Sequence, residues 1–252
     1  MTRKIGVVGA GTMGQGIANA FASAGNEVTV VDVKKEWAEN GVAKICASKD
    51  KLVARGKIDA EAAEAAKANL KAGVYEDLAD CDLIVEAVLE QMPVKKELFA
   101  KLDEIVKEGA IFGTNTSSLS VTEIANGIKH PVIGMHFFNP ADRMKLVEVI
   151  SGANTPAEVK DEIIAISKEI GKTPVEVNEG PGFVVNRILV PMINEATFIL
   201  QEGIASASDI DTAMQLGANH PMGPLALGDL IGLDIVLAIM DVLYNETGDS
   251  KY

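Results

Sequence analysis

The sequence predicts an α/β protein in which a doubly wound, mainly parallel sheet is followed by a smaller all-α domain. Two observations support this fold class. Short apolar runs alternate with helical patterns over the first two thirds of the chain, which is typical of a parallel sheet covered by helices on both faces. Beyond Gly180 the residues follow helical periodicity only. We therefore place a Rossmann-like domain at residues 1–182 and a helical domain at residues 183–252.

The first element is an apolar strand at residues 5–8, followed by a glycine-rich turn and a helix over residues 14–24. Glycines at positions 9, 11 and 14 match the Gly-X-Gly-X-X-Gly pattern that binds the pyrophosphate of a dinucleotide. Gly9 permits the tight turn, Gly11 lets the backbone approach the phosphates, and Gly14 lets the helix pack closely on the strand. The start of the helix adds unpaired N–H groups that attract anions.

A second strand, residues 27–31, ends at Asp32, which lies 23 residues after Gly9. A carboxylate at this spacing accepts hydrogen bonds from the adenosine ribose of NAD, and it repels the extra phosphate of NADP. A solvated residue at a strand end is the simpler interpretation of Asp32. The order strand, turn, helix, strand and acid favours a site for NAD rather than NADP, with Thr12 and Met13 completing the turn.

The remaining elements continue the alternation and then become helical. We expect strands at residues 82–86, 110–114, 131–136, 146–150 and 173–177. We expect helices at residues 36–55, 59–70, 93–106, 121–125, 155–170, 183–201, 208–216 and 226–244, with Ser208 as an N-cap. In such a fold, ligands bind at the carboxyl ends of the strands.

Charge and composition exclude several classes of function. Lys and Arg number 23 against 36 Asp and Glu, a formal net charge of −13, so the chain would repel nucleic-acid phosphates overall. No apolar stretch approaches the roughly 20 residues that span a bilayer, and residues 1–4 lead directly into the first strand, which predicts no signal peptide. Cys46 and Cys81 stand apart from each other and from His, so neither a disulfide nor a metal site is expected. We expect a soluble intracellular protein.

A basic run interrupts this acidic chain between the second and third predicted strands. Residues 44–57 carry a net charge of +4, from Lys44, Lys49, Lys51, Arg55 and Lys57 against Asp50. Such a run is often a solvated helix face. It is equally compatible with a clamp for a phosphorylated substrate, since positive charge here would attract anions that the rest of the surface repels.

His136 is the candidate for acid/base chemistry. It ends the strand at residues 131–136, whereas His130 and His220 each precede a proline in a predicted turn. A lone His is more often structural than catalytic, but this one lies at the carboxyl edge of the predicted sheet. An imidazole there can remove the proton of an alcohol whose hydride is transferred to the dinucleotide.

Glu148 is the candidate partner of His136. It lies 12 residues later, in the next predicted strand, and a loop over residues 140–144 could bring its carboxylate beside the imidazole. A His–Glu dyad would fix the tautomer of the ring and stabilise the imidazolium form. Simple alternation with Val147 and Val149 would equally place Glu148 at an exposed strand position, so the pattern leaves both interpretations open.

Two further segments bring polar groups to the expected site. Ser117 lies within residues 114–119, Thr-Asn-Thr-Ser-Ser-Leu, which hold more hydroxyl and amide groups than helix capping needs. Asn186 follows Gly180-Pro-Gly at the domain junction and could donate its amide to a carbonyl oxygen that gains charge during reduction. Alternatively, Asn186 caps or anchors the first helix of the second domain.

Five segments together resemble the L-3-hydroxyacyl-CoA dehydrogenases, and they occur in the order found in that family. They are GAGTMG at residues 9–14, NTSSL at 115–119, HFFNP at 136–140, PGFVVNR at 181–187 and HPMGP at 220–224. The resemblance covers essentially all 252 residues. It implies the reaction of the short-chain members, the reversible NAD-dependent oxidation of (S)-3-hydroxybutanoyl-CoA to acetoacetyl-CoA.

The resemblance also implies a role for each candidate residue. His136 would be the general acid/base, Glu148 its partner, and Ser117 and Asn186 the residues that hold the substrate oxygen. Contacts to the nicotinamide side of NAD are implied for Glu90 and Lys95, and Ser117 and Asn139 are implied to bind the cofactor as well. Contacts to the CoA moiety are implied for Ser48 and Arg55, with Lys51 on the same helix, which favours the phosphate clamp.

The family also leads us to expect a homodimer formed through the helical domain, an acyl-CoA partner and a bacterial, cytoplasmic protein. Members usually continue beyond the equivalent of Tyr252 into a further helical segment, so we expect the second domain here to be truncated. Two other functions fit parts of the pattern. One is an NAD-dependent dehydrogenase of a free hydroxy or sugar acid, and the other is a non-catalytic NAD-binding protein.

Overall fold

The computed structural model describes residues 2–252, which divide into two compact units. The first unit ends at Glu179 and the second is Gly180–Tyr252. In the part of the chain described, no helix combines the length and the apolar character needed to cross a membrane.

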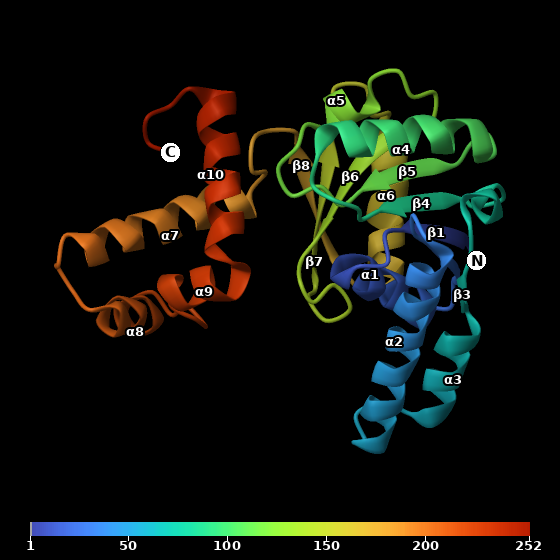
Figure 1. The fold of residues 1–252 in the computed structure, drawn as a ribbon, viewed down its shortest axis with the longest axis horizontal. Coiled ribbons are helices and arrows are strands. Elements are labelled where there is room, and N and C mark those ends of the chain that lie inside the picture. Colours follow the sequence, from blue (N-terminus) through green and yellow to red (C-terminus); the bar gives the residue numbers. More distant parts are fainter. Residues whose placement is uncertain (1) are drawn as a thin grey trace. The chain divides into compact units, whose positions relative to one another are not determined.

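The first unit is built on an eight-stranded sheet with the order β3-β2-β1-β4-β5-β6-β7-β8 (Figure 1). Its strands are β1 (Lys4–Val8), β2 (Glu27–Val31), β3 (Leu70–Ala72), β4 (Leu83–Glu86), β5 (Ile111–Thr114), β6 (Val132–Phe137), β7 (Leu146–Ser151) and β8 (Thr173–Asn178). Every neighbouring pair is parallel except β6 and β7, which run antiparallel. The strand order reverses at β1, between β2 and β4, which is where a doubly wound sheet binds its ligand.

Helices cover both faces of this sheet. They are α1 (Thr12–Ser23), α2 (Lys35–Ala54), α3 (Ala60–Ala68), the short 3₁₀ helix η1 (Tyr75–Leu78), α4 (Met92–Ile105), α5 (Val121–Ala125) and α6 (Ala157–Glu169). Apolar residues of α1 and α6 share one core cluster with the strands, while α4 lies on the opposite face (Figure 1). The predicted doubly wound α/β fold is confirmed.

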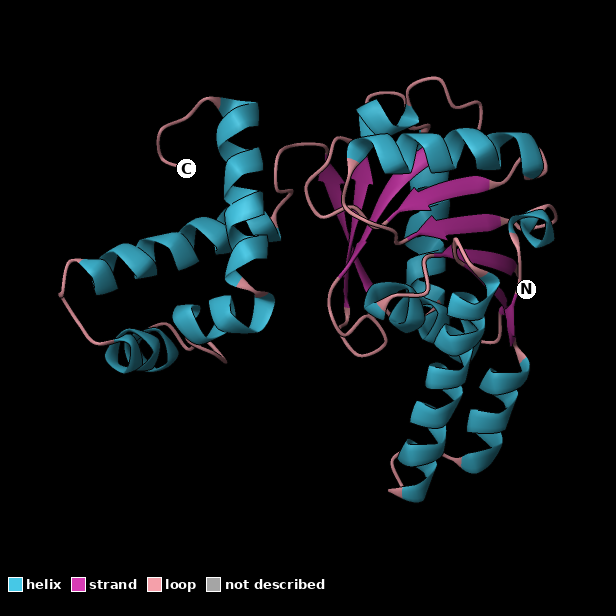
Figure 2. Cartoon of the chain, in the orientation of Figure 1, coloured by secondary structure: helices cyan, strands magenta, loops and turns pink. Residues whose placement is uncertain are grey.

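The predicted strands match the structure to within one or two residues, but β3 is missing from the prediction. The sequence pattern extends the second helix of the insertion to Leu70, whereas α3 ends at Ala68 and Leu70 starts a three-residue edge strand. Three residues are too few for a period of two to be recognised. The insertion itself is present as predicted: α2 and α3 form a helical pair that extends beyond the sheet (Figure 2).

The second unit is entirely helical, as predicted (Figure 2). It contains α7 (Val185–Gln201), α8 (Ala207–Gly217), α9 (Pro224–Ile231) and α10 (Leu233–Thr247). Two details of the prediction are wrong. The N-cap of α8 is Ser206, whose hydroxyl accepts from the N–H of Asp209, rather than Ser208. The single helix expected at residues 226–244 is two helices, because the chain turns at Gly232 with φ of 104°.

Candidate functional site

The glycine-rich turn joins β1 to α1 at the point where the strand order reverses. Gly9 has φ of 106°, and a Cβ atom there would lie 2.3 Å from the carbonyl oxygen of Ala87. A Cβ atom on Gly14 would lie 1.7 Å from the carbonyl oxygen of Gly9. At Gly11 a Cβ atom would meet nothing within 4 Å. Protein packing therefore requires the first and third glycines, whereas the space over Gly11 is left for a ligand.

The N-terminus of α1 is suited to a pyrophosphate. Its N-cap is Gly11, and no side chain caps the first turn, so the N–H groups there are available to an anion. Asp32 lies beside this turn, where its carboxylate accepts the N–H of Ala10 and of Val33, each at 2.7 Å. Two backbone donors leave the carboxylate with further acceptor positions for ribose hydroxyls. These observations fit a dinucleotide.

A cavity of about 290 Å³ continues from the turn toward α2. Asp32 and Gly11 line one part of it, and Trp37, Gly41 and Lys44 of α2 line another. These three residues of α2 are spaced by four and three positions, so they lie on one face of the helix.

His136 and Glu148 are paired across the antiparallel strands β6 and β7. They stand directly opposite each other in the register, and Nδ1 of His136 lies 2.7 Å from Oε2 of Glu148. Both side chains are buried, with 6% and 1% of their surfaces exposed. A buried carboxylate that contacts one ring nitrogen stabilises the imidazolium and orients the ring. Of the two interpretations that the sequence leaves open for Glu148, the structure has the one with a side-chain contact to His136.

The loop after β5 is joined to the strand that carries His136. The side-chain oxygen of Asn115 accepts the N–H of Phe137 at 2.8 Å, which fixes the loop against the end of β6. Ser117 follows on the same loop and is half-buried. The carboxylate of Glu90 holds this loop, because it accepts the N–H of Ser117 at 2.6 Å and the hydroxyl of Thr116 at 2.6 Å.

Lys95 is almost fully buried, with 1% of its side chain exposed, and its ammonium joins two carboxylates. Its Nζ lies 2.7 Å from Glu86 and 3.1 Å from Glu90. Glu86 also accepts the hydroxyl of Thr114 at 2.6 Å. Of the two residues expected at the nicotinamide side, Glu90 is thus the more exposed one, and the buried Lys95 forms an ion pair with it.

Glu86 and Lys172 are two buried charges that the sequence pattern does not single out. Glu86 ends an otherwise apolar strand, which is the one signal that could have marked it. Lys172 donates to the carbonyl oxygens of Ala141 at 2.6 Å and Met144 at 2.8 Å, so it holds the connection between β6 and β7. Burial lowers the pKa of Lys172.

The basic run separates into one buried and several exposed residues. Lys49 packs inward, where its Nζ donates to the hydroxyl of Ser23 at 2.8 Å and burial lowers its pKa. It is therefore not part of an external clamp. Ser48 and Lys51 of α2 and its C-cap residue Arg55 are exposed, and their spacing of three and four residues places them on one side of the helix. Lys44, which lines the cavity, lies four residues before Ser48 and therefore on the same side of α2.

Two predicted site residues remain to be placed. Asn139 is exposed and follows directly on the strand β6 that carries His136. Asn186 lies in the first turn of α7, in the second unit. His130, the histidine that we did not select, contacts Asp103 through Nδ1 at 2.6 Å and the carbonyl oxygen of Lys107 through Nε2 at 2.9 Å.

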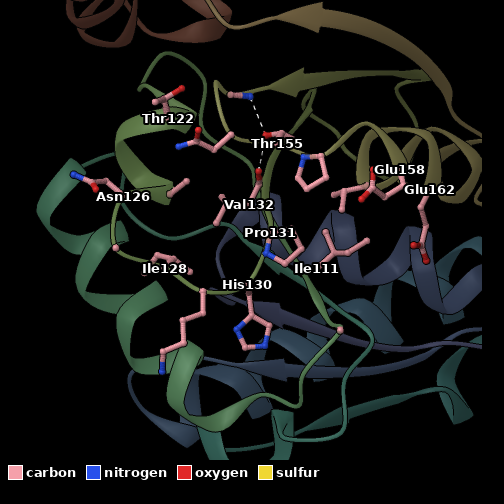
Figure 3. Close-up of a pocket in the computed structure, with 18 residues that line it drawn as sticks. Ile111, Thr122, Asn126, Ile128, His130, Pro131, Val132, Thr155, Glu158 and Glu162 are labelled. Carbon is pink, nitrogen blue, oxygen red and sulfur yellow. Dashed lines mark hydrogen bonds between the residues drawn. The ribbon is translucent and has the colours of Figure 1, made fainter.

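A second cavity, of about 540 Å³, lies at the amino ends of β5 and β6 (Figure 3). The Thr155 hydroxyl at its wall donates to the carbonyl oxygen of Val132 at 2.8 Å and accepts the N–H of Gly152 at 3.0 Å. The Thr155 hydroxyl thus joins the loop before α6 to β6. It contains none of the residues selected above and lies at the edge of the sheet opposite to His136.

Comparison with known proteins decides the family. The family model described as "3-hydroxyacyl-CoA dehydrogenase, NAD binding domain" matches residues 4–180, and the one described as "3-hydroxyacyl-CoA dehydrogenase, C-terminal domain" matches residues 182–252. The chain belongs to the 3-hydroxyacyl-CoA dehydrogenase family. It is accordingly an NAD-dependent oxidoreductase, and the resemblance drawn from the five segments is confirmed.

Individual members of the family are similar over nearly the whole chain. A 3-hydroxybutyryl-CoA dehydrogenase of Clostridioides difficile is 56% identical over 252 residues, which are 99% of this chain and 90% of the relative. The human mitochondrial hydroxyacyl-coenzyme A dehydrogenase is 40% identical over 96% of this chain and 80% of its own length. The crystal structure of (S)-3-hydroxybutyryl-CoA dehydrogenase from Ralstonia eutropha superimposes with a TM-score of 0.95 at 46% identity, covering 100% of this chain and 90% of that one.

Proposed function

We propose that this family member catalyses the reversible oxidation of (S)-3-hydroxybutanoyl-CoA to acetoacetyl-CoA with NAD, and that His136 and Glu148 form its acid/base dyad. The observation that carries the proposal is the buried 2.7 Å contact between these two side chains at the carboxyl end of β6. Relatives at 56% and 46% identity bear the name 3-hydroxybutyryl-CoA dehydrogenase, which supports the choice of substrate.

The proton and the hydride leave the alcohol by different routes. The glycine-rich turn and Asp32 would hold NAD, which would supply the acceptor for the hydride of C3 and, in its reduced form, the donor for the reverse reaction. Because Glu148 holds Nδ1 of His136, proton exchange with the 3-hydroxyl falls to Nε2. The C3–O bond becomes a carbonyl as the imidazole gains the proton, and the Glu148 carboxylate stabilises the resulting imidazolium.

Ser117 and Asn186 are proposed to hold the reacting oxygen, where negative charge develops during reduction. The position of Ser117 depends on Glu90, which accepts its backbone N–H. We assign Glu90 and Asn139 to the nicotinamide side of NAD, with Lys95 orienting Glu90 through the 3.1 Å contact between them.

The direct test is an assay of NADH consumption with acetoacetyl-CoA. We expect turnover by the wild-type protein, and a fall in kcat of about 10²- to 10⁴-fold in the near-isosteric variant His136→Asn, which is the range that a general acid/base contributes. A wild-type protein that binds NADH and still consumes none would refute the proposed reaction. A His136→Asn variant with unchanged kcat would refute the role of the imidazole and leave the reaction standing.

The exposed face of α2 is proposed to bind the phosphates of CoA through Ser48, Lys51 and Arg55. Reversing both charges, in Lys51→Glu/Arg55→Glu, should raise the KM for acetoacetyl-CoA about tenfold, since the loss of two exposed pairs costs on the order of 1.4 kcal/mol. The charge reversal Lys168→Glu, on the exposed face of α6, is the matched control. An unchanged KM would favour a free hydroxy or sugar acid as the substrate.

We further propose that the protein is a homodimer of the bacterial cytoplasm that associates through its helical unit. Large apolar side chains of this unit are exposed, among them Leu216 at 83%, Leu230 at 70% and Ile188 at 67%, and we infer that a second copy covers such side chains. The two free thiols accord with a reducing compartment. Light scattering should give the mass of a dimer for the wild-type protein and for Val74→Glu in the first unit. The mass of a monomer for the wild type would refute this.

A further inference from the structure

The cavity between the glycine-rich turn and α2 is lined in part by an aromatic residue to which no function has yet been assigned. Trp37 lines it, and 49% of this large aromatic residue is exposed. An exposed indole gains free energy when a ligand covers its apolar ring, which is why Trp is enriched at binding surfaces. We propose that Trp37 is the platform on which the adenine base of NAD stacks.

The backbone holds Trp37 in this position. Gly41, one helical turn later on the same face of α2, packs on the glycine-rich turn so closely that a Cβ atom would lie 3.0 Å from Cβ of Ala10. The N–H of Ala10 is in turn bound by Asp32 at 2.7 Å. The phosphate turn, the ribose-binding carboxylate and the indole are therefore linked through short contacts, in the order in which pyrophosphate, ribose and base occur in adenosine diphosphate.

The size of the cavity and the cation over the Trp37 ring agree with a nucleoside. Its volume of about 290 Å³ suits one nucleoside and is too small for a complete dinucleotide. Lys34 lies over the Trp37 ring, with Nζ 5.1 Å from the centroid, so one side of the indole already bears a cation. A purine stacked on the indole would gain from the polarised ring as well as from the apolar area that it covers.

CoA also carries an adenine, and its proposed phosphate clamp lies further along the same helix. The cavity favours NAD because Gly11 and Asp32 form part of its wall, whereas Ser48, Lys51 and Arg55 do not. The inference rests on the NAD of the proposed function, and it adds the residue that recognises the base.

The test uses intrinsic fluorescence, because Trp37 is the single tryptophan of the chain. With excitation that tyrosine does not absorb, 5′-AMP and NAD should change the Trp37 emission of the wild-type protein saturably. Nicotinamide mononucleotide, which lacks adenine, should not. If 3′,5′-ADP, the nucleotide half of CoA, changes the emission while 5′-AMP does not, the platform belongs to CoA and our inference is overturned.

Calorimetry on two variants separates stacking from mere proximity. We expect Trp37→Ala to bind 5′-AMP and NAD about 5- to 150-fold more weakly, the range for loss of one base-on-aromatic stack, and Trp37→Phe to restore most of the affinity. Nicotinamide mononucleotide should bind all three proteins equally. Equal NAD affinities in wild type and Trp37→Ala would refute the platform, while continued turnover of acetoacetyl-CoA by the wild type would show that the proposed reaction is unaffected.

Discussion

Replacing Glu148 by Gln tests the dyad with little change in shape. The amide of Gln can still accept from Nδ1 of His136, so the substitution removes mainly the charge from a contact of 2.7 Å between two buried side chains. A hydrogen bond to a charged group contributes about 1.5 to 3 kcal/mol. Because about 1.4 kcal/mol corresponds to a factor of ten in rate, kcat should fall about 10- to 150-fold.

The measurement is steady-state consumption of NADH at several concentrations of acetoacetyl-CoA, together with the melting temperature of each protein. The KM should change little, because Glu148 acts on the imidazole rather than on CoA. Glu176→Gln is the matched control: Glu176 lies on the adjacent strand β8, opposite Val149, and is exposed. If Glu148→Gln folds normally and keeps kcat within about threefold of wild type, the carboxylate has no part in proton transfer and our reasoning fails.

Other predictions follow from single contacts. Gly11→Ala should have the melting temperature of the wild type but bind NAD more weakly in calorimetry, because its Cβ atom meets no protein atom within 4 Å. Gly14→Ala should melt at a lower temperature, because its Cβ atom would lie 1.7 Å from the backbone oxygen of Gly9. Asp32→Asn should lower the ratio of the initial rate with NADH to that with NADPH, because the variant lacks the carboxylate charge that repels the 2′-phosphate of NADPH. Burial raises the pKa of Asp103, but hydrogen bonds from the ring and N–H of His130 and from a neighbouring N–H outweigh it and hold that pKa below its usual value. Asp103→Asn should therefore lower the free energy of unfolding in urea by about 2 kcal/mol at neutral pH. A carboxylate whose pKa is lowered in the folded protein stabilises the fold at every pH above its pKa in the unfolded chain, which is about 4. The difference in unfolding free energy between wild type and Asp103→Asn should therefore shrink as the pH falls below about 4. A difference that stays constant with pH would contradict this role of Asp103.

The elements near the site were predictable because each has a strong local signal. The glycine spacing, the acid that follows β2 and the histidine at the end of β6 can all be read from short segments. Glu148 could be proposed but not placed, because its pairing with His136 depends on the register of two strands. That register is set by packing and by the connecting loop, neither of which a periodic pattern encodes.

The burial of Trp37 and Lys49 could not be predicted from the sequence. Both lie on α2, in a segment where polar and apolar residues alternate too irregularly to show which face is buried. The cationic side chain of Lys49 turned inward and the aromatic one stayed partly exposed, against the usual preferences. Only the position of α2 against Ala10 and of Lys49 near Ser23 explains this, and tertiary packing of that kind overrides sequence propensity.

The antiparallel pair formed by β6 and β7 has a consequence for how such an enzyme can diversify. Residues directly opposite in an antiparallel ladder have Cβ atoms about 5 Å apart on the same face, whatever the length of the hairpin that joins them. The spacing of the His136 and Glu148 side chains is thus guaranteed by the backbone ladder itself. Insertions or replacements in the connection over residues 138–145 can therefore change the loop while the proposed His136–Glu148 dyad is inherited unchanged.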